Sequence, residues 1–391
     1  MADLLKKATK PEVHRGLEGV VVDETELSVI DGSVGELRYH GYRIEDLARH
    51  ADFEEVLYLL WHGHLPDDDE YEAFAEAMAS ERTIGDDVLQ TAELLAKSDE
   101  EPMAALRTLV SMLSSSDPES DADPEDMDAA LRKGRRITAK IPTVLAAFDR
   151  YRNGEEPLDP RDDLGHAANF LYMLSGEEPD DVAADIFDVA LILHADHGLN
   201  ASTFTTMVVS STYADIYNAV TAGVGALAGH WHGGANQDVM ETLIELDESG
   251  QDPIDWVEDA INEGRRIPGF GHRVYDVKDP RAKILEEFSE DLAVESGEPR
   301  WYDYTTSVEE YLLDERGLGE KGIAPNVDFY SGSVYYQLGI PIDLYTPIFA
   351  MSRVGGWVGH VLEYQADNRL IRPRAHYTGP DHQDFVPRSD R

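Results

Sequence analysis

The sequence predicts an all-α, mainly helical protein that carries one small β-hairpin near its N-terminus. Apolar residues recur at helical spacings over most of the chain, whereas a clear alternation of apolar and polar residues occurs once, near the start. The chain has 391 residues, of which 42% are hydrophobic. It can therefore bury a large core, and two domains are expected.

The hairpin is expected within residues 17–42, LEGVVVDETELSVIDGSVGELRYHGY. Apolar and polar side chains alternate there around the dipeptide Asp31-Gly32. An Asp-Gly pair between two such runs is typical of a tight β-turn.

The first helical segment is expected over residues 43–63, where Ile44, Leu47 and Leu60 follow helical spacing and Gly63 is a stop signal. The same spacing predicts further helices near 67–81, 86–97, 102–116, 126–151, 161–175, 179–195, 214–228, 236–247, 253–264, 279–295, 305–316, 331–338 and 346–365. The nearly uncharged segment 200–237 is rich in small residues and predicts tightly packed, buried helices.

Residues 114–128, SSSDPESDADPEDMD, form an acidic run between two expected helices. The run resembles a calcium-binding loop in composition, but it lacks the glycine and the closing glutamate of such loops. We therefore expect a solvated linker.

The charge composition excludes several classes of partner. Aspartate and glutamate total 78 against 33 lysines and arginines, so the formal net charge is −45. This charge repels nucleic acid and anionic membranes, and neither is an expected partner. It also suggests a halophilic, salt-adapted protein, because at about 1 M salt the Debye length is only about 3 Å.

Other composition signals concern chemistry and location. The chain has no cysteine, so it has no disulfide, zinc–thiolate site or cysteine nucleophile. The N-terminal residues 1–16 contain no apolar stretch typical of a secretory signal, and no segment reads as a membrane span. A cytoplasmic location is expected.

Four segments place ionisable residues beside glycines in apolar surroundings, as clefts often require. They are HADHGLN (194–200), LAGHWHGGANQ (227–237), IPGFGHRVYDVKDPR (267–281) and PNVDFYSG (325–332).

The first of these segments raises the question of a metal site. His194 and His197 are three residues apart with Asp196 between them, and on a continuous helix both rings could reach one ion. However, Gly198 stands where a glycine would end the helix. The alternative is that His194 caps a buried helix while His197 alone projects outward. A positively charged histidine near a helix C-terminus also suits the helix dipole, which could explain one of the two.

Taken together, the segments indicate a different chemistry. They supply three histidines (197, 232 and 272), Asp328 and several arginines. Arginine is suited to bidentate recognition of carboxylates, and a carboxylate beside histidines can move a proton at carbon. A site for a small di- or tricarboxylate is therefore expected.

In order and spacing these segments resemble citrate synthase, over nearly the whole chain from IDGSVGELRYHGYRIEDLA (30–48) to RPRAHYTG (372–379). GHRVYDVKDPR and PNVDFYSG are the most specific parts, and the match is closest to the dimeric archaeal and bacterial form. The resemblance implies a large helical domain of residues 1–226 and 331–391, a small domain of residues 227–330 that closes over substrate, and a homodimer. It also implies condensation of acetyl-CoA with oxaloacetate, hydrolysis to citrate and CoA, and no metal or tightly bound cofactor.

The resemblance also implies roles for individual residues. Asp328 matches the general base that removes a proton from the acetyl methyl group, and His232 matches the group that hydrogen-bonds the thioester oxygen. His272 matches the residue that polarises the oxaloacetate carbonyl. A simpler alternative for Asp328 is a cap for a helix starting near Ser331.

Oxaloacetate and CoA contacts follow from the same resemblance. His197, Arg281, Arg353 and Arg372 match the oxaloacetate-binding residues, with Arg372 reaching the partner subunit's site. The turn residues Pro268, Gly269, Phe270 and Gly271 resemble those that meet the adenine of CoA, and the candidates for its phosphates are Arg273, Lys278 and Lys321. One departure is Asp276, where relatives often have lysine.

Two alternative functions remain open from the sequence. The first is 2-methylcitrate synthase, which takes propionyl-CoA and differs by room for one methyl group, worth about 1–3 kcal/mol of discrimination. The second, from another class, is a metal-dependent hydrolase built on His194, Asp196 and His197.

Overall fold

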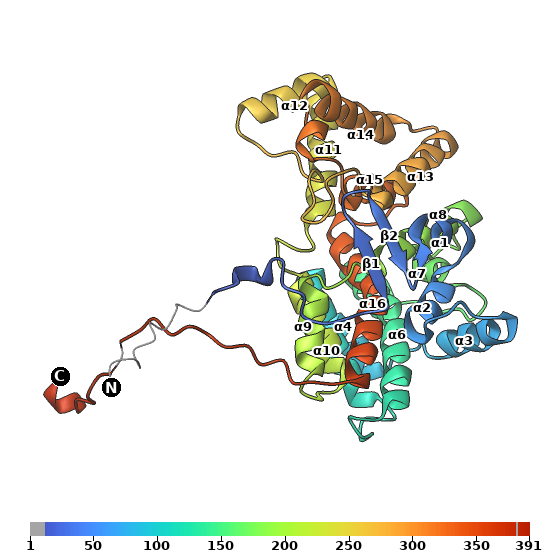
Figure 1. The fold of residues 1–391 in the computed structure, drawn as a ribbon. Helices are drawn as coiled ribbons and strands as arrows, with labels where there is room; N and C mark the ends of the chain where they lie inside the picture. The colour runs from blue at the N-terminus through green and yellow to red at the C-terminus, as the bar shows by residue number, and fades with distance from the viewer. Residues whose placement is uncertain (1–11, 381) are drawn as a thin grey trace. The chain divides into compact units, whose positions relative to one another are not determined.

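The mainly helical prediction is confirmed by a computed structural model, which describes residues 12–380 and 382–391 and contains sixteen α-helices and three short strands in that part of the chain (Figure 1). The strands are β1 Ser28–Asp31, β2 Glu36–Tyr39 and β3 Tyr42–Arg43. The helices are α1 Ile44–His50, α2 Phe53–His62, α3 Asp68–Ser80, α4 Asp86–Lys97, α5 Pro102–Leu113, α6 Met127–Arg152, α7 His166–Ser175, α8 Asp181–His194, α9 Ala201–Ser210, α10 Ile216–Leu227, α11 Ala235–Ser249, α12 Pro253–Asn262, α13 Pro280–Ser296, α14 Arg300–Glu310, α15 Val327–Gln337 and α16 Tyr345–Ala366.

The expected hairpin is shorter than predicted and gains a third strand. β1 pairs antiparallel with β2 in the register Ser28 to Tyr39, and β2 pairs with β3. Described residues before Ser28 belong to no strand, so the prediction of a hairpin from residue 17 was wrong in its extent. Alternation alone does not supply a pairing partner.

The segment expected as one helix over residues 43–63 is two helices, α1 and α2. Asp52 separates them: its carboxylate accepts the backbone N–H of Glu55, and the Glu55 side chain accepts the N–H of Asp52. This reciprocal capping box starts a new helix. The hydrophobic spacing continues across the break because both helices bury a face in the same core. Gly63 ends α2 in a left-handed conformation, as expected.

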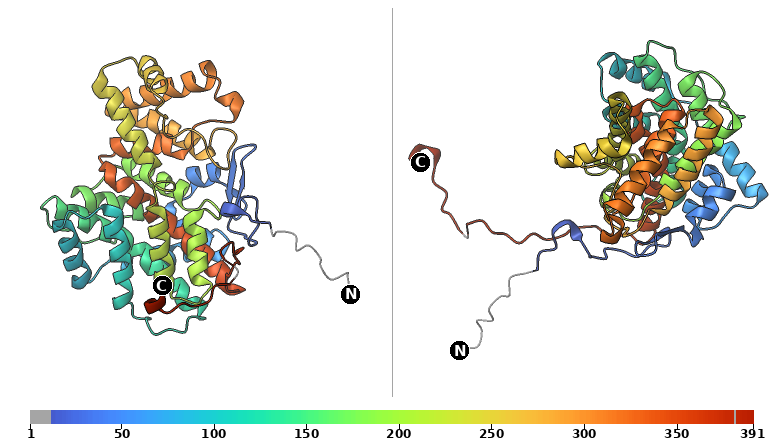
Figure 2. Two further views of the ribbon diagram at one scale, coloured as in Figure 1. Left: turned by 90° about the vertical axis from the view of Figure 1, so that its left-hand side faces the viewer. Right: turned by 90° about the horizontal axis from the view of Figure 1, so that it is seen from above.

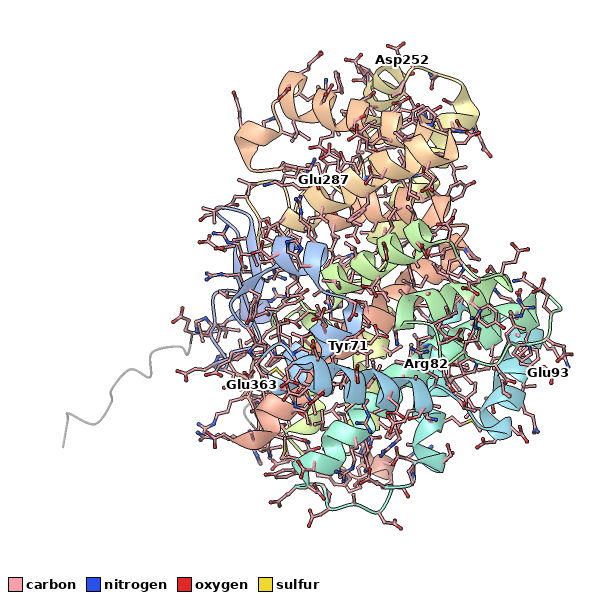
Figure 3. The ribbon with its side chains drawn as sticks, turned by 90° about the vertical axis from the view of Figure 1, so that its right-hand side faces the viewer. Tyr71, Arg82, Glu93, Asp252, Glu287 and Glu363 are labelled. Carbon is pink, nitrogen blue, oxygen red and sulfur yellow. The ribbon has the colours of Figure 1, made fainter. Side chains whose placement is uncertain are left out.

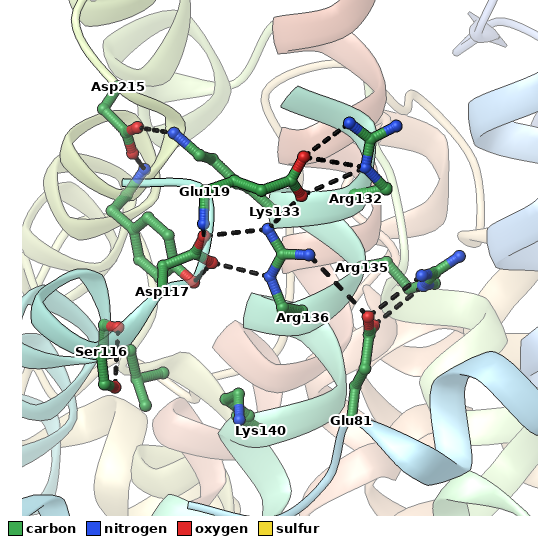
Figure 4. Close-up of polar contacts among 12 residues, drawn as sticks. Glu81, Ser116, Asp117, Glu119, Arg132, Lys133, Arg135, Arg136, Lys140 and Asp215 are labelled. Carbon is green, nitrogen blue, oxygen red and sulfur yellow. Dashed lines mark hydrogen bonds and ion pairs between the residues drawn. The ribbon is translucent and has the colours of Figure 1, made fainter. Parts of the chain in front are cut away.

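The acidic run 114–128 is more than a solvated linker, and that prediction was wrong for two of its residues (Figure 4). The buried Asp117 accepts two hydrogen bonds from Arg136 on α6, at 2.7 and 2.9 Å, and one from Tyr217 on α10 at 2.6 Å. Glu119 binds both Arg132 and Arg136. The loop thus ties α10 to α6, a pairing that composition alone does not reveal.

The long helix α16 is the central element of the body of the molecule, residues Thr25–Arg369. It packs against α2, α6, α8, α9 and α10, while α11, α13, α14 and α15 pack among themselves and α11 also contacts α16. Two further views show the same grouping of helices (Figure 2). The predicted domain boundaries at 226/227 and 330/331 remain a prediction.

The chain ends form a separate unit, within Met1–Glu24 and Leu370–Arg391. Its described residues contain two single-turn 3₁₀ helices, Arg15–Leu17 and Arg388–Asp390. Part of the segment expected to lack a secretory signal, residues 1–11, lies outside the described residues. Across the described chain, every helix is too short or too polar to cross a bilayer.

Candidate active site

The HADHGLN segment leaves the end of α8 and does not continue as a helix. The helix ends at His194, and Gly198 adopts a left-handed conformation with φ +56°. The helix therefore ends within one residue of the predicted end at residue 195, and Gly198 lies beyond that end and is not the C-cap. His194 is fully buried, and its Nδ1 donates to the Ala190 carbonyl at 2.7 Å.

Burial lowers the pKa of His194 to about 3, so its ring is neutral at physiological pH. His194 is therefore not a positively charged histidine that complements the helix dipole. The ring instead packs edge-on against Phe349 of α16, with 4.9 Å between ring centroids.

Asp196 is the polar centre of the same segment and is fully buried. Its carboxylate accepts hydrogen bonds from Ser28 of β1, from the Gly198 backbone at 3.0 Å and from His360 of α16 at 3.1 Å. Burial alone would raise the pKa of Asp196, but His360 and Arg353 hold it at about 2. This carboxylate is therefore ionised, and its hydrogen bonds link β1 and α16 to the segment that carries His197.

The alternative metal site of His194, Asp196 and His197 does not assemble. The three side chains serve different partners: Ala190 for His194, His360 for Asp196 and Tyr275 for His197. Within residues 12–380 and 382–391, no group of three or more histidine, aspartate, glutamate or cysteine side chains is arranged to hold a metal ion.

His197 and His272 come together although they lie 75 positions apart in the chain. Their ring centroids are 5.2 Å apart, and Tyr275 touches both rings, its hydroxyl lying 3.3 Å from His197 Nε2. Burial and the nearby positive charge of Arg281 lower the pKa of both rings, that of His272 to about 4. Both histidines are therefore neutral near pH 7.

The geometry fixes which nitrogen of His272 carries its proton. Nδ1 accepts the backbone N–H groups of Val274 at 3.0 Å and of Tyr275 at 3.2 Å. A nitrogen that accepts cannot carry the hydrogen of a neutral ring, so the proton sits on Nε2. His272 thus offers one N–H donor.

His232 has the opposite arrangement. Its Nε2 accepts the backbone N–H of Ser202, the second residue of α9, at 3.1 Å, and the Ser202 hydroxyl lies 2.8 Å away. Burial and the charge of Arg353 lower the pKa of His232 to about 4. The neutral ring therefore carries its proton on Nδ1, which is left free to donate.

Asp328 lies in the first turn of α15, a helix that begins four residues earlier than expected. Asn326 is its N-cap and accepts the Asp328 backbone N–H at 3.0 Å. The alternative that Asp328 itself caps a helix starting near Ser331 was therefore wrong. Burial raises the pKa of the Asp328 carboxyl to about 6, opposed by the charges of Arg281 and Arg353.

The turn of Pro268, Gly269, Phe270 and Gly271 packs directly against the start of α15. The Asn326 side chain donates to the Gly271 carbonyl at 3.0 Å, and its backbone N–H donates to the Gly269 carbonyl at 2.9 Å. Gly269 has φ +79°, and a Cβ there would lie 2.8 Å from the Cβ of Phe329. Only glycine fits this approach.

Two of the predicted arginines are buried beside these groups. Arg353 is 1% exposed, donates from Nε to the His194 carbonyl at 2.7 Å and lies over the Phe349 ring. Arg281 is 2% exposed and forms an ion pair with Asp279 at 2.7 Å. The third, Arg372, belongs to the separate unit of the chain ends.

The three candidate cations for CoA phosphates differ in their surroundings. Lys278 already binds Glu286 at 2.6 Å and Glu309 at 2.7 Å, so its charge is compensated. Arg273 and Lys321 are exposed. Sequence alone gave no means of separating them.

Several residues that hold the site together were missed by sequence reasoning. They are Ser202, Tyr275, Asn326, Trp357 and His360. Asn326 could have been found as an N-cap signal next to Asp328. The others act across the fold, and nothing in their local sequence marks the partner.

Comparisons with known proteins agree on one family. The sequence family described as "Citrate synthase, C-terminal domain" matches residues 16–374. The citrate synthase of Haloferax volcanii is 58% identical over 381 residues, covering 97% of this chain and 99% of the relative. Relatives named 2-methylcitrate synthase also match, at lower identity.

Solved structures give the same result. Citrate synthase from Pyrobaculum aerophilum superposes with a TM-score of 0.90 at 42% identity, covering 97% of this chain and 95% of that one. The citrate synthase of Thermoplasma acidophilum, solved as a ternary complex with carboxymethyl coenzyme A and oxaloacetate, superposes with a TM-score of 0.88 at 34% identity, covering 97% and 100%.

Proposed function

The chain belongs to the citrate synthase family, and on that premise we propose how its own side chains carry the reaction. The protein is an acyltransferase that condenses acetyl-CoA with oxaloacetate and hydrolyses the resulting thioester to citrate and CoA. One observation carries the assignment of roles: the charges of Arg281 and Arg353 both act on the Asp328 carboxyl, whose pKa is raised, and the same charges act on the neutral rings of His272 and His232 respectively, each of which presents a single N–H.

Asp328 is the general base that takes a proton from the acetyl methyl group. Burial raises its pKa to about 6, which makes it a stronger base than an ordinary aspartate. This pKa is still far below that of a carbon acid, so the enol must be stabilised. His232 supplies that stabilisation by donating Nδ1–H to the thioester oxygen as negative charge develops there.

His272 activates the second substrate. Its Nε2–H donates to the ketone oxygen of oxaloacetate, and the enol carbon then attacks the polarised carbonyl carbon. The new C–C bond forms as the C=O π electrons move to oxygen, which takes the proton from Nε2, and the proton that Asp328 removed from the methyl group then replaces it on the His272 ring. Water then hydrolyses the citryl thioester and releases CoA as the thiol.

The carboxylates of oxaloacetate are held by His197, Arg281, Arg353 and Arg372 of the partner subunit. Burial strengthens the contacts of Arg281 and Arg353, because charge–charge attraction grows as water is excluded. This assignment makes the active unit a homodimer. Size measurement in molar KCl, together with loss of oxaloacetate affinity in Arg372→Ala, tests it.

CoA is bound at the turn of Pro268, Gly269, Phe270 and Gly271, through backbone groups. Arg273 and Lys321 are the phosphate contacts, because Lys278 is already paired with two carboxylates. Arg273→Ala should raise the KM for acetyl-CoA and leave that for oxaloacetate unchanged, whereas Lys278→Ala should mainly lower stability.

The protein is also adapted to concentrated salt. Its formal charge of −45 and its 58% identity to the Haloferax volcanii enzyme support this. Figure 3 shows acidic side chains on separate helices, including Glu93 on α4, Glu287 on α13 and Glu363 on α16. Such a surface requires screening by salt.

The decisive experiment is release of thiol from acetyl-CoA, dependent on oxaloacetate, in molar KCl. Asp328→Asn should lower kcat by at least about 10³-fold, because an amide cannot accept the proton, while oxaloacetate still binds. Asp255→Asn, an exposed aspartate in the first turn of α12, is the matched control and should keep full activity. Full activity in Asp328→Asn would contradict the mechanism.

The same assay separates the two acyl substrates. We expect kcat/KM to be larger for acetyl-CoA than for propionyl-CoA. The reverse order would make the protein a 2-methylcitrate synthase while leaving the roles of Asp328, His232 and His272 intact.

A further inference from the structure

We propose that Trp357 of α16 is a positioning residue for the reaction: through the Ser202 hydroxyl it fixes the ring of His232 so that Nδ1–H faces substrate. The inference rests on the proposed role of His232. Trp357 does not itself touch substrate.

The indole of Trp357 is held rigidly. The side chain is completely buried and is among the largest buried side chains of the described residues. Gly223 of α10 lies against the ring, and a Cβ there would come within 3.1 Å of Cδ2 and Cε2. Its Nε1–H donates to Ser202 Oγ at 3.2 Å.

The Ser202 hydroxyl can donate only one hydrogen, and two acceptors lie within reach. These are His232 Nε2 at 2.8 Å and Asn200 Oδ1 at 2.7 Å. Asn200 Oδ1 already accepts the backbone N–H groups of Ser202 and Thr203, both at 3.1 Å, as the N-cap of α9. Two backbone donors therefore already share Asn200 Oδ1, whereas one backbone donor, the Ser202 N–H, shares the lone pair of His232 Nε2, which favours donation of the hydroxyl hydrogen to His232.

Trp357 completes this arrangement. By donating to Oγ it occupies a lone pair of the hydroxyl, holds the oxygen in place and strengthens the hydrogen bond that the hydroxyl donates. His232 Nε2 is then an acceptor from both the hydroxyl and the backbone N–H of Ser202. The ring proton has to stay on Nδ1, where the proposed mechanism uses it.

Trp357 lies on the helix that also carries other residues of the site, so its hydrogen bond to Ser202 connects His232 to those residues. The same helix contributes Arg353, which donates to the His194 carbonyl, and His360, which binds Asp196 behind His197. Successive turns of α16 thus hold the segments of both His197 and His232. One rigid helix sets the positions of the two histidines relative to Arg353.

The test compares Trp357→Phe with Trp61→Phe in molar KCl. Trp61 is the matched control, because its Nε1–H donates to another part of α16, the Gly355 carbonyl at 2.9 Å. Loss of one hydrogen bond that acts on the transition state should lower kcat about five- to tenfold in Trp357→Phe, with KM for oxaloacetate unchanged. Trp61→Phe should lower the melting temperature about as much as Trp357→Phe does, and it should leave kcat unchanged. Equal effects on kcat in the two variants would overturn the proposal.

A double-mutant cycle with Ser202→Ala provides the second measurement. If Trp357 acts through Ser202, the loss in kcat from Trp357→Phe should disappear in the Ser202→Ala background. If the losses in kcat of the two single variants instead multiply in the double variant, Trp357 acts independently of Ser202 and only stabilises the core. Should Trp357→Phe not fold, Ser202→Ala decides alone, since unchanged kcat in that variant also overturns the proposal. Full activity in His232→Ala would instead contradict the proposed function itself.

Discussion

Asp196 and His360 form an ion pair that is closed off from solvent, with 3.1 Å between Oδ1 and Nε2 and each side chain at most 1% exposed. The pKa of Asp196 is held at about 2, whereas Asp196 raises that of His360 above its usual value in spite of burial. The pair connects α16 to the segment that carries His197. Breaking this ion pair is therefore expected to lower both the stability of the protein and its affinity for oxaloacetate.

Asp196→Ala should destabilise the protein by about 3–5 kcal/mol, because it leaves His360, Ser28 and the Gly198 backbone without their buried acceptor. Denaturant unfolding in molar KCl measures this change. The control is Glu245→Ala, which breaks an exposed ion pair with Arg265 and should cost about 0–1 kcal/mol. Similar losses of unfolding free energy in the two variants would show that the buried pair contributes no more to stability than the exposed one.

The pH dependence of kcat/KM for acetyl-CoA should follow Asp328. The base acts only when ionised, and burial raises its pKa to about 6. The rate should therefore fall as pH drops through about 6 and level off above about 7. His232 and His272, with pKa values of about 4, are already neutral over that range. An acid limb centred below pH 5 would contradict the assignment.

Gly32→Ala should disturb the loop that carries His272. The Gly32 carbonyl accepts the Asp276 N–H at 3.0 Å, and a Cβ at Gly32 would lie 1.8 Å from the Val274 carbonyl oxygen. The turn must move, so we expect kcat to fall about tenfold or more while the helical content is retained. Gly319→Ala, where the nearest atom would be 3.7 Å from the new Cβ, should behave as wild type. A normal kcat in Gly32→Ala would mean that the hairpin does not position His272.

Salt should control the stability of the fold. Removing KCl lengthens the Debye length to about 30 Å at 0.01 M and exposes a net charge of −45 to its own repulsion. We expect the melting temperature to rise strongly from dilute buffer to molar KCl, with refolding on return of salt. An unchanged melting temperature would refute salt adaptation.

Much of the helical fold could be predicted from the sequence, because most helices display their buried face as a repeated apolar spacing and their ends as local signals. The helix predicted over 86–97 is α4, Asp86–Lys97, with the same ends. The helix α9 was not separated from its neighbours, because most of its buried positions hold serine or threonine, so its buried face carries little hydrophobic pattern. The pairing of β2 with a third strand was also not predicted, because the local sequence of a strand does not identify the strand with which it pairs.

The sequence predicted which residues form the candidate site, but it did not predict their protonation states or their hydrogen-bond partners. The sequence supplied Asp328, His197, His232 and His272 and the order in which they occur. It also suggested a positively charged histidine at the end of the helix before Gly198, a cap role for Asp328 and Lys278 as a candidate contact for the CoA phosphates. In the folded chain burial keeps His194 neutral, Asn326 takes the cap position before Asp328, and two glutamates pair with Lys278.

By itself, then, the sequence determined which chemical groups exist, most of the helices that carry them and the large negative charge of the surface. Only the tertiary structure decided where the protons sit: on Nδ1 of His232, because Ser202 donates to Nε2, and on Nε2 of His272, because two backbone N–H groups donate to Nδ1. The physical reason is that a proton's position depends on the donors and acceptors around a ring. In this protein those partners come from residues that are distant in the chain or from the backbone of a loop held in place by the fold.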